Sequence, residues 1–122
     1  MSLIIQSSNG AHRFTVDVAA TPDQQERGLM FVKSLAPDRG MIFPYDPPAS
    51  VSFWMRNTLI PLSVAFIGDD GSVVNIDDMK PQTLDSHCSA KPVRFVLEMN
   101  GGWFAKRGIK VGSRLRGGPF GP

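Results

Sequence analysis

The sequence predicts a mostly β domain, leaning towards α+β, built as an antiparallel sandwich or a partly open barrel with two short helices. Several runs alternate between apolar and polar residues, as strands with one buried face do. The chain also holds 12 glycines and 10 prolines in 122 residues, so turns interrupt it often. Only two segments carry the signals of a helix. We expect residues 1–122 to form one domain, because this length is typical of one.

The first predicted element is a hairpin. Two strand-like runs, Leu3–Ser7 and Arg13–Ala20, flank a short polar segment that contains Asn9 and Gly10. Asn-Gly is the dipeptide most typical of tight hairpin turns. The second run alternates apolar and polar residues, which indicates a half-buried strand.

Both helices are predicted from their ends. For Pro22–Arg27, Thr21 can cap the first turn, proline suits the first helical position, and Gln24 completes a capping box. Gly28 then offers an exit with a left-handed backbone. The second helix is predicted near Trp103–Arg107, between glycines.

The segment between residues 36 and 50, APDRGMIFPYDPPAS, contains four prolines. Proline cannot donate a backbone hydrogen bond, so we expect no long regular element here. Only Gly40–Phe43 is predicted as a short strand, within an ordered loop.

The later strands are predicted from alternation and from the turn GDDGS at residues 68–72. In the run that contains Glu98, the alternate positions are strongly apolar, so we expect Glu98 on the polar or concave side of the sheet. The predicted strands are residues 51–55, 62–67, 73–79, 93–99 and 109–115.

The charge is close to balanced overall, with a formal net charge of +2, but it is unevenly spread. The stretch Lys91–Arg116 holds seven basic residues and one acid, Glu98. Such a stretch can attract anionic partners, but a solvated basic face is the favoured interpretation. It lacks the interleaved aromatics of RNA-binding motifs, which argues against nucleic acid as a partner.

The single cysteine, Cys88, excludes an internal disulfide. No run reaches the roughly 18 apolar residues of a membrane span, so we expect none. The expected location is periplasmic or exported if a leader was removed ahead of this sequence, and cytoplasmic otherwise. The sequence identifies no protein partner.

Metal and cofactor chemistry finds little support. His87 and Cys88 are adjacent, but His12 is the only other histidine, and a structural zinc site needs about four ligands with recurring spacing. The glycines near residue 101 lack the spacing of a phosphate-binding loop. We therefore predict no metal, no cofactor and no catalytic residue.

One stretch combines an aromatic ring, a cation and two small hydrogen-bonding side chains. Stacking on an aromatic ring together with charged hydrogen bonds is how pockets hold small polar or anionic ligands, such as a sugar or a carboxylate. The alternative is purely structural, with an ion pair beneath the ring and a turn beside it. The candidate ligand-binding residues are Trp54, Arg56, Asn57, Thr58 and Glu98.

The favoured hypothesis is a small binding or accessory module with a pocket at Trp54–Thr58. A second hypothesis is a small enzyme in which burial raises the pKa of Glu98 and suits it to proton transfer beside Arg56. A third is weak nucleic-acid binding through the basic stretch Lys91–Arg116. Of these hypotheses, a binding module is favoured over an enzyme.

Several segments together resemble the domain-of-unknown-function family 192, small proteins of bacteria and archaea. The resemblance covers residues 13 to 116 and leaves 117–122 as a flexible tail. The segments are TPDQQERGLMF, RGMIFPYDPP, VSFWMRNTLIPLSVAFIGDDGSV, RFVLEMNGG and GIKVGSRL.

The resemblance implies a compact β-rich fold with short helices, no established activity, and export signals or lipoprotein leaders in many members. It also implies lysine where this chain has Arg56, and aspartate where it has Ser63 and Ser113. If that family aspartate at Ser63 is catalytic, this chain should lack the activity.

Overall fold

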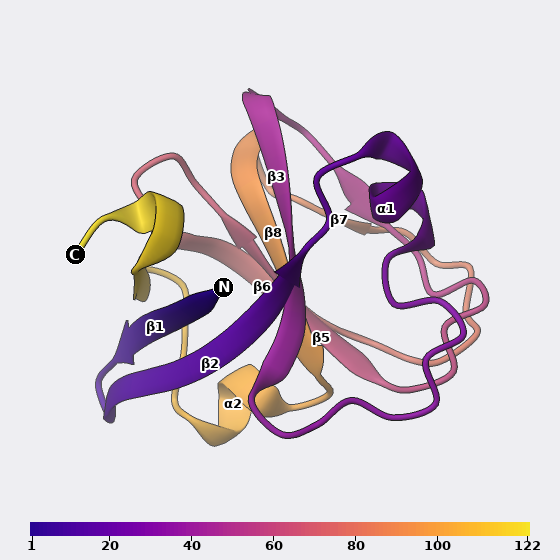
Figure 1. The fold of residues 1–122 in the computed structure, drawn as a ribbon, viewed down its shortest axis with the longest axis horizontal. Coiled ribbons are helices and arrows are strands. Elements are labelled where there is room, and N and C mark those ends of the chain that lie inside the picture. Colours follow the sequence, from indigo (N-terminus) through magenta and orange to yellow (C-terminus); the bar gives the residue numbers. More distant parts are fainter.

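The computed structural model describes residues 1–122 and confirms a mostly β fold, with 45% of residues in strands and 11% in helices. A seven-stranded sheet, in the order β6-β5-β8-β3-β2-β1-β9, curls into a half-barrel, and a two-stranded sheet pairs β4 with β7 (Figure 1). The strands are β1 (Ser2–Ser7), β2 (Gly10–Val18), β3 (Arg39–Ala49), β4 (Ser52–Phe53), β5 (Leu62–Ile67), β6 (Val73–Met79), β7 (His87–Cys88), β8 (Val93–Asn100) and β9 (Arg114–Arg116). The helices are α1 (Pro22–Arg27), α2 (Trp103–Lys106) and the 3-10 helix η1 (Gly118–Phe120).

Both predicted α-helices are present. Thr21 caps α1 with its hydroxyl on the backbone N–H of Gln24, and the Gln24 side chain returns to the backbone of Thr21, which completes the capping box. The first hairpin also forms, but Ser7 pairs with Gly10, so its two-residue turn is one position earlier than Asn9-Gly10.

The sheet differs from the prediction in one pair of strands. All neighbours are antiparallel except β2 and β3, which run parallel with Val16 opposite Gly40. The chain between them, through α1 and residues 28–38, returns to the end of the sheet at which β2 began, and β3 starts there (Figure 1). Sequence alternation alone does not record this crossover.

Strand β3 also differs, because it continues through the proline-rich segment. Its pairing with β2 ends at Ile42, and its pairing with β8 is interrupted between Pro44 and Ala49. The later prolines therefore lie where β3 has lost one neighbour and where the ladder is irregular, and such positions tolerate a missing N–H.

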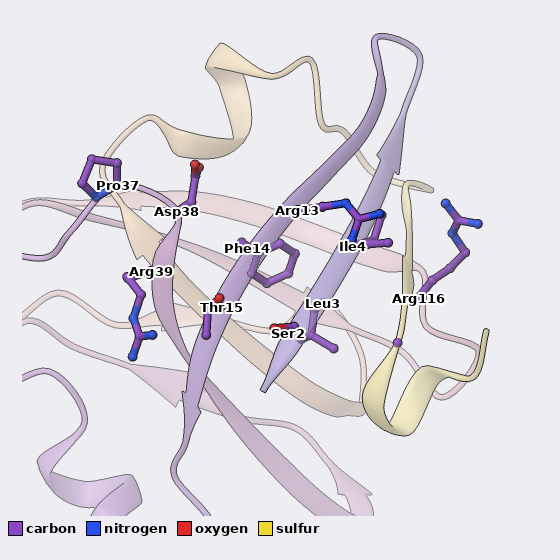
Figure 2. A pocket seen from close by; sticks show the side chains of 11 residues that line it. Ser2, Leu3, Ile4, Arg13, Phe14, Thr15, Pro37, Asp38, Arg39 and Arg116 are labelled. Carbon is purple, nitrogen blue, oxygen red and sulfur yellow. The ribbon is translucent and has the colours of Figure 1, made fainter.

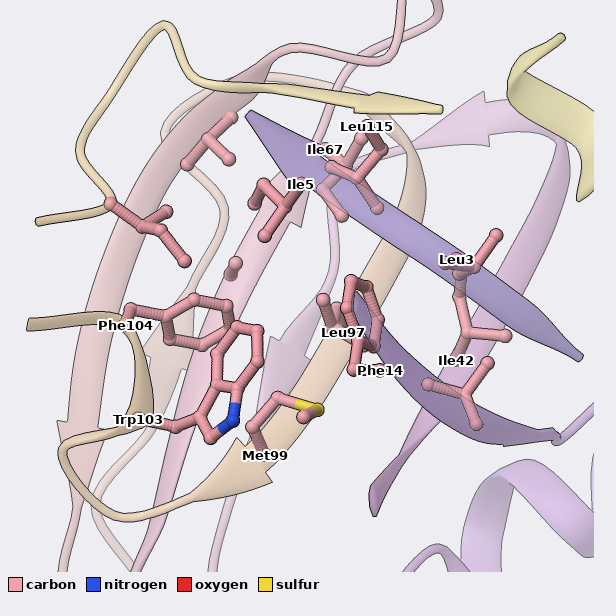
Figure 3. Close-up of a cluster of buried hydrophobic side chains, with 14 residues drawn as sticks. Leu3, Ile5, Phe14, Ile42, Ile67, Leu97, Met99, Trp103, Phe104 and Leu115 are labelled. Atoms are coloured by element: carbon pink, nitrogen blue, oxygen red, sulfur yellow. The ribbon is translucent and has the colours of Figure 1, made fainter. Parts of the chain in front are cut away.

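The two faces of the sheet carry separate cores. The inner layer lies within the curl and includes Ile5, Phe14, Leu97 and Trp103 (Figure 3). The outer layer covers the other face of β3, β5 and β8, where Phe43, Val64 and Val96 lie. The segment after α1 and the loop around β4 cover this layer, since Leu29 and Met55 belong to it.

One expectation changes as a result. Glu98 does not lie on a polar face, because the face it shares with Val96 is covered by the outer layer and Glu98 is only 4% exposed. Within the C-terminal residues, Gly118–Phe120 form η1, and Phe120 packs edge-to-face on Phe95 with their ring centroids 4.7 Å apart. The flexibility of residues 117–122 stays a prediction.

Candidate functional site

Helix α1 supplies one side of the candidate site. None of its six residues is buried, because the segment PDQQER lacks an apolar stripe. The helix ends at Gly28, whose φ of 49° lets the chain turn while its N–H donates to the carbonyl of Gln24. The following turn exposes Phe31, which is 56% accessible.

A tight turn between Met55 and Thr58 supplies the other side. The N–H of Thr58 donates to the carbonyl of Met55 at 3.1 Å, so Arg56 and Asn57 occupy the turn centre. Asn57 has a φ of 56°, which type II turns need at their third position and which asparagine tolerates well. Met55 is fully buried and anchors the turn in the outer layer.

One backbone hydrogen bond joins the two sides. The N–H of Phe31 donates to the carbonyl of Asn57 at 2.9 Å. Both residues have positive φ, at 65° and 56°, which is uncommon outside glycine and clusters at functional positions. The bond fixes the turn after α1 against the turn before β5, although about 26 residues of chain separate them.

Between these two turns lies a surface pocket of about 440 Å³, which we call the α1 pocket. The guanidinium carbon of Arg56 lies 5.6 Å from the centroid of the Trp54 ring, and that of Arg27 lies 5.8 Å from the Phe31 ring. Both distances fit a cation–π contact. The lining residues are Asp23, Glu26, Arg27, Met30, Phe31, Trp54, Arg56 and Asn57.

The charged side chains of the α1 pocket balance one another in number, and none of them forms an ion pair. Two acids, Asp23 and Glu26, face two bases, Arg27 and Arg56, and no ion pair joins any of them. Trp54 is 47% exposed, so its indole is accessible. The pocket therefore offers hydrogen-bond donors, acceptors and aromatic surface without a dominant charge.

The structure thus brings three of the five predicted site residues, Trp54, Arg56 and Asn57, to one pocket. Thr58 lies beneath them, 5% exposed, and its hydroxyl donates to the carbonyl of Arg56 at 3.2 Å. Thr58 therefore holds the turn in shape, while its predicted contact with a ligand stays a prediction.

Glu98 lies apart from the pocket lining. Its carboxyl is under Gly28, where a Cβ atom would lie 3.8 Å from Oε1 and 3.5 Å from the Phe43 ring. Burial raises the pKa of Glu98 to about 8. No hydrogen bond or ion pair joins Glu98 to Arg56, so the predicted structural pair is absent, and a role of Glu98 in proton transfer stays a prediction.

The α1 side of the pocket was missed from the sequence. Glu26 and Arg27 follow Asp23 by three and four positions, which places both beside Asp23 on one face of a helix. A capped helix without an apolar stripe is the signal that could have identified them, since its side chains remain free for a ligand.

The other polar groups singled out in the sequence have structural partners. Ser63 is buried, donates to Asp78 Oδ1 at 2.6 Å and accepts from the N–H of Gly102 at 2.8 Å. His87 Nδ1 lies 2.6 Å from Asp77 Oδ2, whereas its Nε2 is buried without a hydrogen-bond partner. No group of three or more His, Cys, Asp or Glu side chains gathers as metal ligands would. None of the helices is long and apolar enough to cross a bilayer.

Comparison with known proteins places the chain in a family. A crystal structure of a protein of unknown function from Novosphingobium aromaticivorans DSM 12444 is 39% identical, with a TM-score of 0.92 over 96% of this chain and 84% of that one. A putative transcription regulator from Sinorhizobium meliloti 1021 is 36% identical, with a TM-score of 0.91 over 95% and 92% of the two chains. A comparison with curated proteins finds no match. The family model of DUF192, described as Uncharacterized ACR, matches residues 4–117, and the chain belongs to this family.

Proposed function

We propose that this protein is a binding module that takes a small, neutral and hydroxyl-rich ligand, such as a sugar, in the pocket between α1 and the Trp54–Asn57 turn. The observation that carries the proposal is the pairing of two exposed aromatic rings, Trp54 and Phe31, with two arginines around one pocket. Its volume of about 440 Å³ is within the range of small-molecule sites.

The charges favour a neutral ligand over an anion. Two carboxylates and two guanidiniums line the pocket, so an anion near Arg56 would also meet Asp23 or Glu26. A polyol, by contrast, can donate to the carboxylates and accept from the guanidiniums. Its C–H faces can rest on the indole, which presents a broad apolar surface.

The pocket is also held ready for a ligand. The Phe31–Asn57 backbone bond and the buried Met55 fix both turns before anything binds. A preformed site loses less conformational entropy on binding, which favours measurable affinity even for a small ligand.

Tryptophan fluorescence tests the proposal directly. The chain has two tryptophans, of which Trp54 is 47% exposed and Trp103 is 3% exposed. A sugar that covers the indole should therefore shift the emission of Trp54 and leave that of Trp103 unchanged. We expect a saturable shift in the wild type, and none in Trp54→Phe.

Arg56→Ala and the double variant with Trp54→Ala should also lose the thermal shift that sugars produce in the wild type. Leu84→Ala is the matched control, because Leu84 is a 64% exposed apolar residue outside the pocket. If wild type and pocket variants respond alike to every sugar and carboxylate tested, the proposed function is wrong.

A further inference from the structure

A second surface pocket, of about 420 Å³, lies on the outer face of β1 and β2, away from the α1 pocket (Figure 2). We call it the arginine pocket, because Arg13, Arg39 and Arg116 all line it. It uses none of the residues of the α1 pocket, so an inference about it stands independently of the proposed function.

Strand register places two of these arginines around one apolar residue. Ile4 of β1 is opposite Arg13 of β2 on one side and opposite Arg116 of β9 on the other. Residues directly opposite in a sheet point to the same face, and neighbouring strands lie about 4.8 Å apart. The two arginine Cα atoms are thus about 10 Å apart. In Figure 2 the Arg13 side chain extends towards Ile4, and the Arg116 side chain stands on the other strand beside it.

Both guanidiniums retain unused donors. Arg13 makes no ion pair, and Arg116 only donates to the amide oxygen of Gln6 at 3.3 Å. Arg39, at the other end of the pocket, makes an exposed pair with Asp17 at 3.3 Å, and such pairs contribute little.

The one acid in the pocket does not neutralise them. Asp38 Oδ1 accepts from Trp103 Nε1 at 2.9 Å and from Arg107 at 2.8 Å, so the charge of this carboxylate is already paired with Arg107, which lies outside the pocket. The pocket is therefore positive, whereas the α1 pocket is balanced. Hydroxyls of Ser2 and Thr15 lie between its ends, where they can donate to the rest of a ligand (Figure 2).

We propose that the arginine pocket binds a small phosphate-bearing molecule, with the phosphate held between Arg13 and Arg116 over Ile4. A carboxylate has two oxygens and is satisfied by one guanidinium fork. A phosphate has three free oxygens and nearly two charges, so it matches two forks that approach from opposite sides. Nucleic acid fits less well, because no exposed aromatic ring lines the pocket for base stacking.

The probes for the test are inorganic phosphate and pyrophosphate, measured by calorimetry at constant ionic strength, with acetate as the carboxylate comparison. We expect saturable binding of pyrophosphate to the wild type and at least tenfold weaker binding to Arg13→Gln and Arg116→Gln. Arg114→Gln is the matched control, because Arg114 lies on the same strand as Arg116, faces outward, and pairs with Asp70 outside the pocket. It should bind as the wild type does.

Amide chemical shifts give a second readout. Pyrophosphate should move the signals of Ile4, Arg13 and Thr15 and should leave that of Trp54 in place. Trp54→Phe should retain full binding, which separates this site from the α1 pocket. The proposal is overturned if phosphate and pyrophosphate do not saturate, if acetate binds equally, or if Arg114→Gln loses as much affinity as Arg116→Gln. Binding only to single-stranded oligonucleotides, or only to vesicles that contain phosphatidic acid, would likewise overturn it.

Discussion

Glu98 acts on the ionisation of Tyr45 at the edge of the outer core layer. Burial and, to a smaller extent, the negative charge of Glu98 together raise the pKa of Tyr45 to about 12. Burial alone raises the pKa of Glu98 to about 8. A carboxyl in this position is therefore neutral in the folded protein at neutral pH, and the two groups become charged only in alkaline solution.

The first prediction concerns stability against pH. An unfolded glutamate has a pKa near 4.5, whereas folded Glu98 keeps its proton to about 8. Between these pH values the folded state binds more protons than the unfolded state, so the stability falls as pH rises. The unfolding equilibrium constant rises by up to about tenfold for each pH unit. Glu98→Gln removes this pH dependence, because glutamine does not ionise. In urea unfolding, the free energy of unfolding of the variant should therefore rise relative to that of the wild type from pH 4.5 to 8.

Glu26→Gln is the control for this measurement, because Glu26 is an exposed glutamate on α1. Its stability should follow the wild-type pH profile. Parallel profiles for wild type and Glu98→Gln would show that Glu98 ionises normally, and the interpretation of a buried neutral carboxyl would then be wrong.

The second prediction uses the fact that Tyr45 is the only tyrosine. Ultraviolet absorbance of the phenolate therefore reports its titration without interference from another tyrosine. In Glu98→Gln the repulsive charge is absent while the burial of the phenol remains. The pKa of Tyr45 should fall below the wild-type value of about 12 and should stay above the ordinary value of 10.0. Circular dichroism at each pH confirms that the protein is folded, and an unchanged titration would exclude the coupling.

Local signals in the sequence predicted most of the elements, and long-range contacts account for the errors. The capping box at Thr21 and the alternation in β5 depend on neighbours in the chain, so they could be recognised. The burial of Glu98 could not, because the cover over it comes from Leu29 and from the loop around Met55. Strand alternation shows which side chains share a face, but it does not show whether a second layer covers that face.

The candidate site follows the same division. Trp54 and Arg56 were found because an aromatic and a cation stand close together in the sequence. Arg27 and Phe31 were not found in this way. They are distant from Trp54 in the sequence, and the hydrogen bond from the N–H of Phe31 to the Asn57 carbonyl brings the two segments to the same pocket. The arginine pocket depends even more on pairing, since Arg13 and Arg116 are adjacent only through β1.

The third prediction concerns Ser63 and Asp78, which are directly opposite on β5 and β6. Ser63→Asp introduces the residue that the family resemblance implies, but it places a second carboxylate against Asp78. We expect a loss of about 1–3 kcal/mol in the free energy of unfolding, because a like charge then sits at a buried position. Adding Asp78→Ser restores one carboxylate and one hydroxyl across the strands, and the new carboxylate can still accept from the N–H of Gly102.

A double-mutant cycle in urea measures this coupling. The pair of changes should be clearly more stable than Ser63→Asp alone. Purely additive effects would mean that the Ser63–Asp78 hydrogen bond, at 2.6 Å, does not determine which residues this position accepts.

The last prediction tests how closely β3 and β8 approach. A Cβ on Gly40 would overlap the backbone carbonyl oxygen of Glu98 and the sulfur of Met99. The methionine can move, but the carbonyl can move only if the β3–β8 ladder separates, so Gly40→Ala should cost at least about 3 kcal/mol. Gly68→Ala is the matched control, because Gly68 is also buried and a Cβ there would make only ordinary contacts at 3.5 Å. Thermal and urea unfolding should show a large loss for the first variant, or failure to fold, and a loss below about 1 kcal/mol for the second. Equal stability of the two variants would show that β3 and β8 can separate at Gly40 without loss, contrary to the close pairing of Gly40 with Met99.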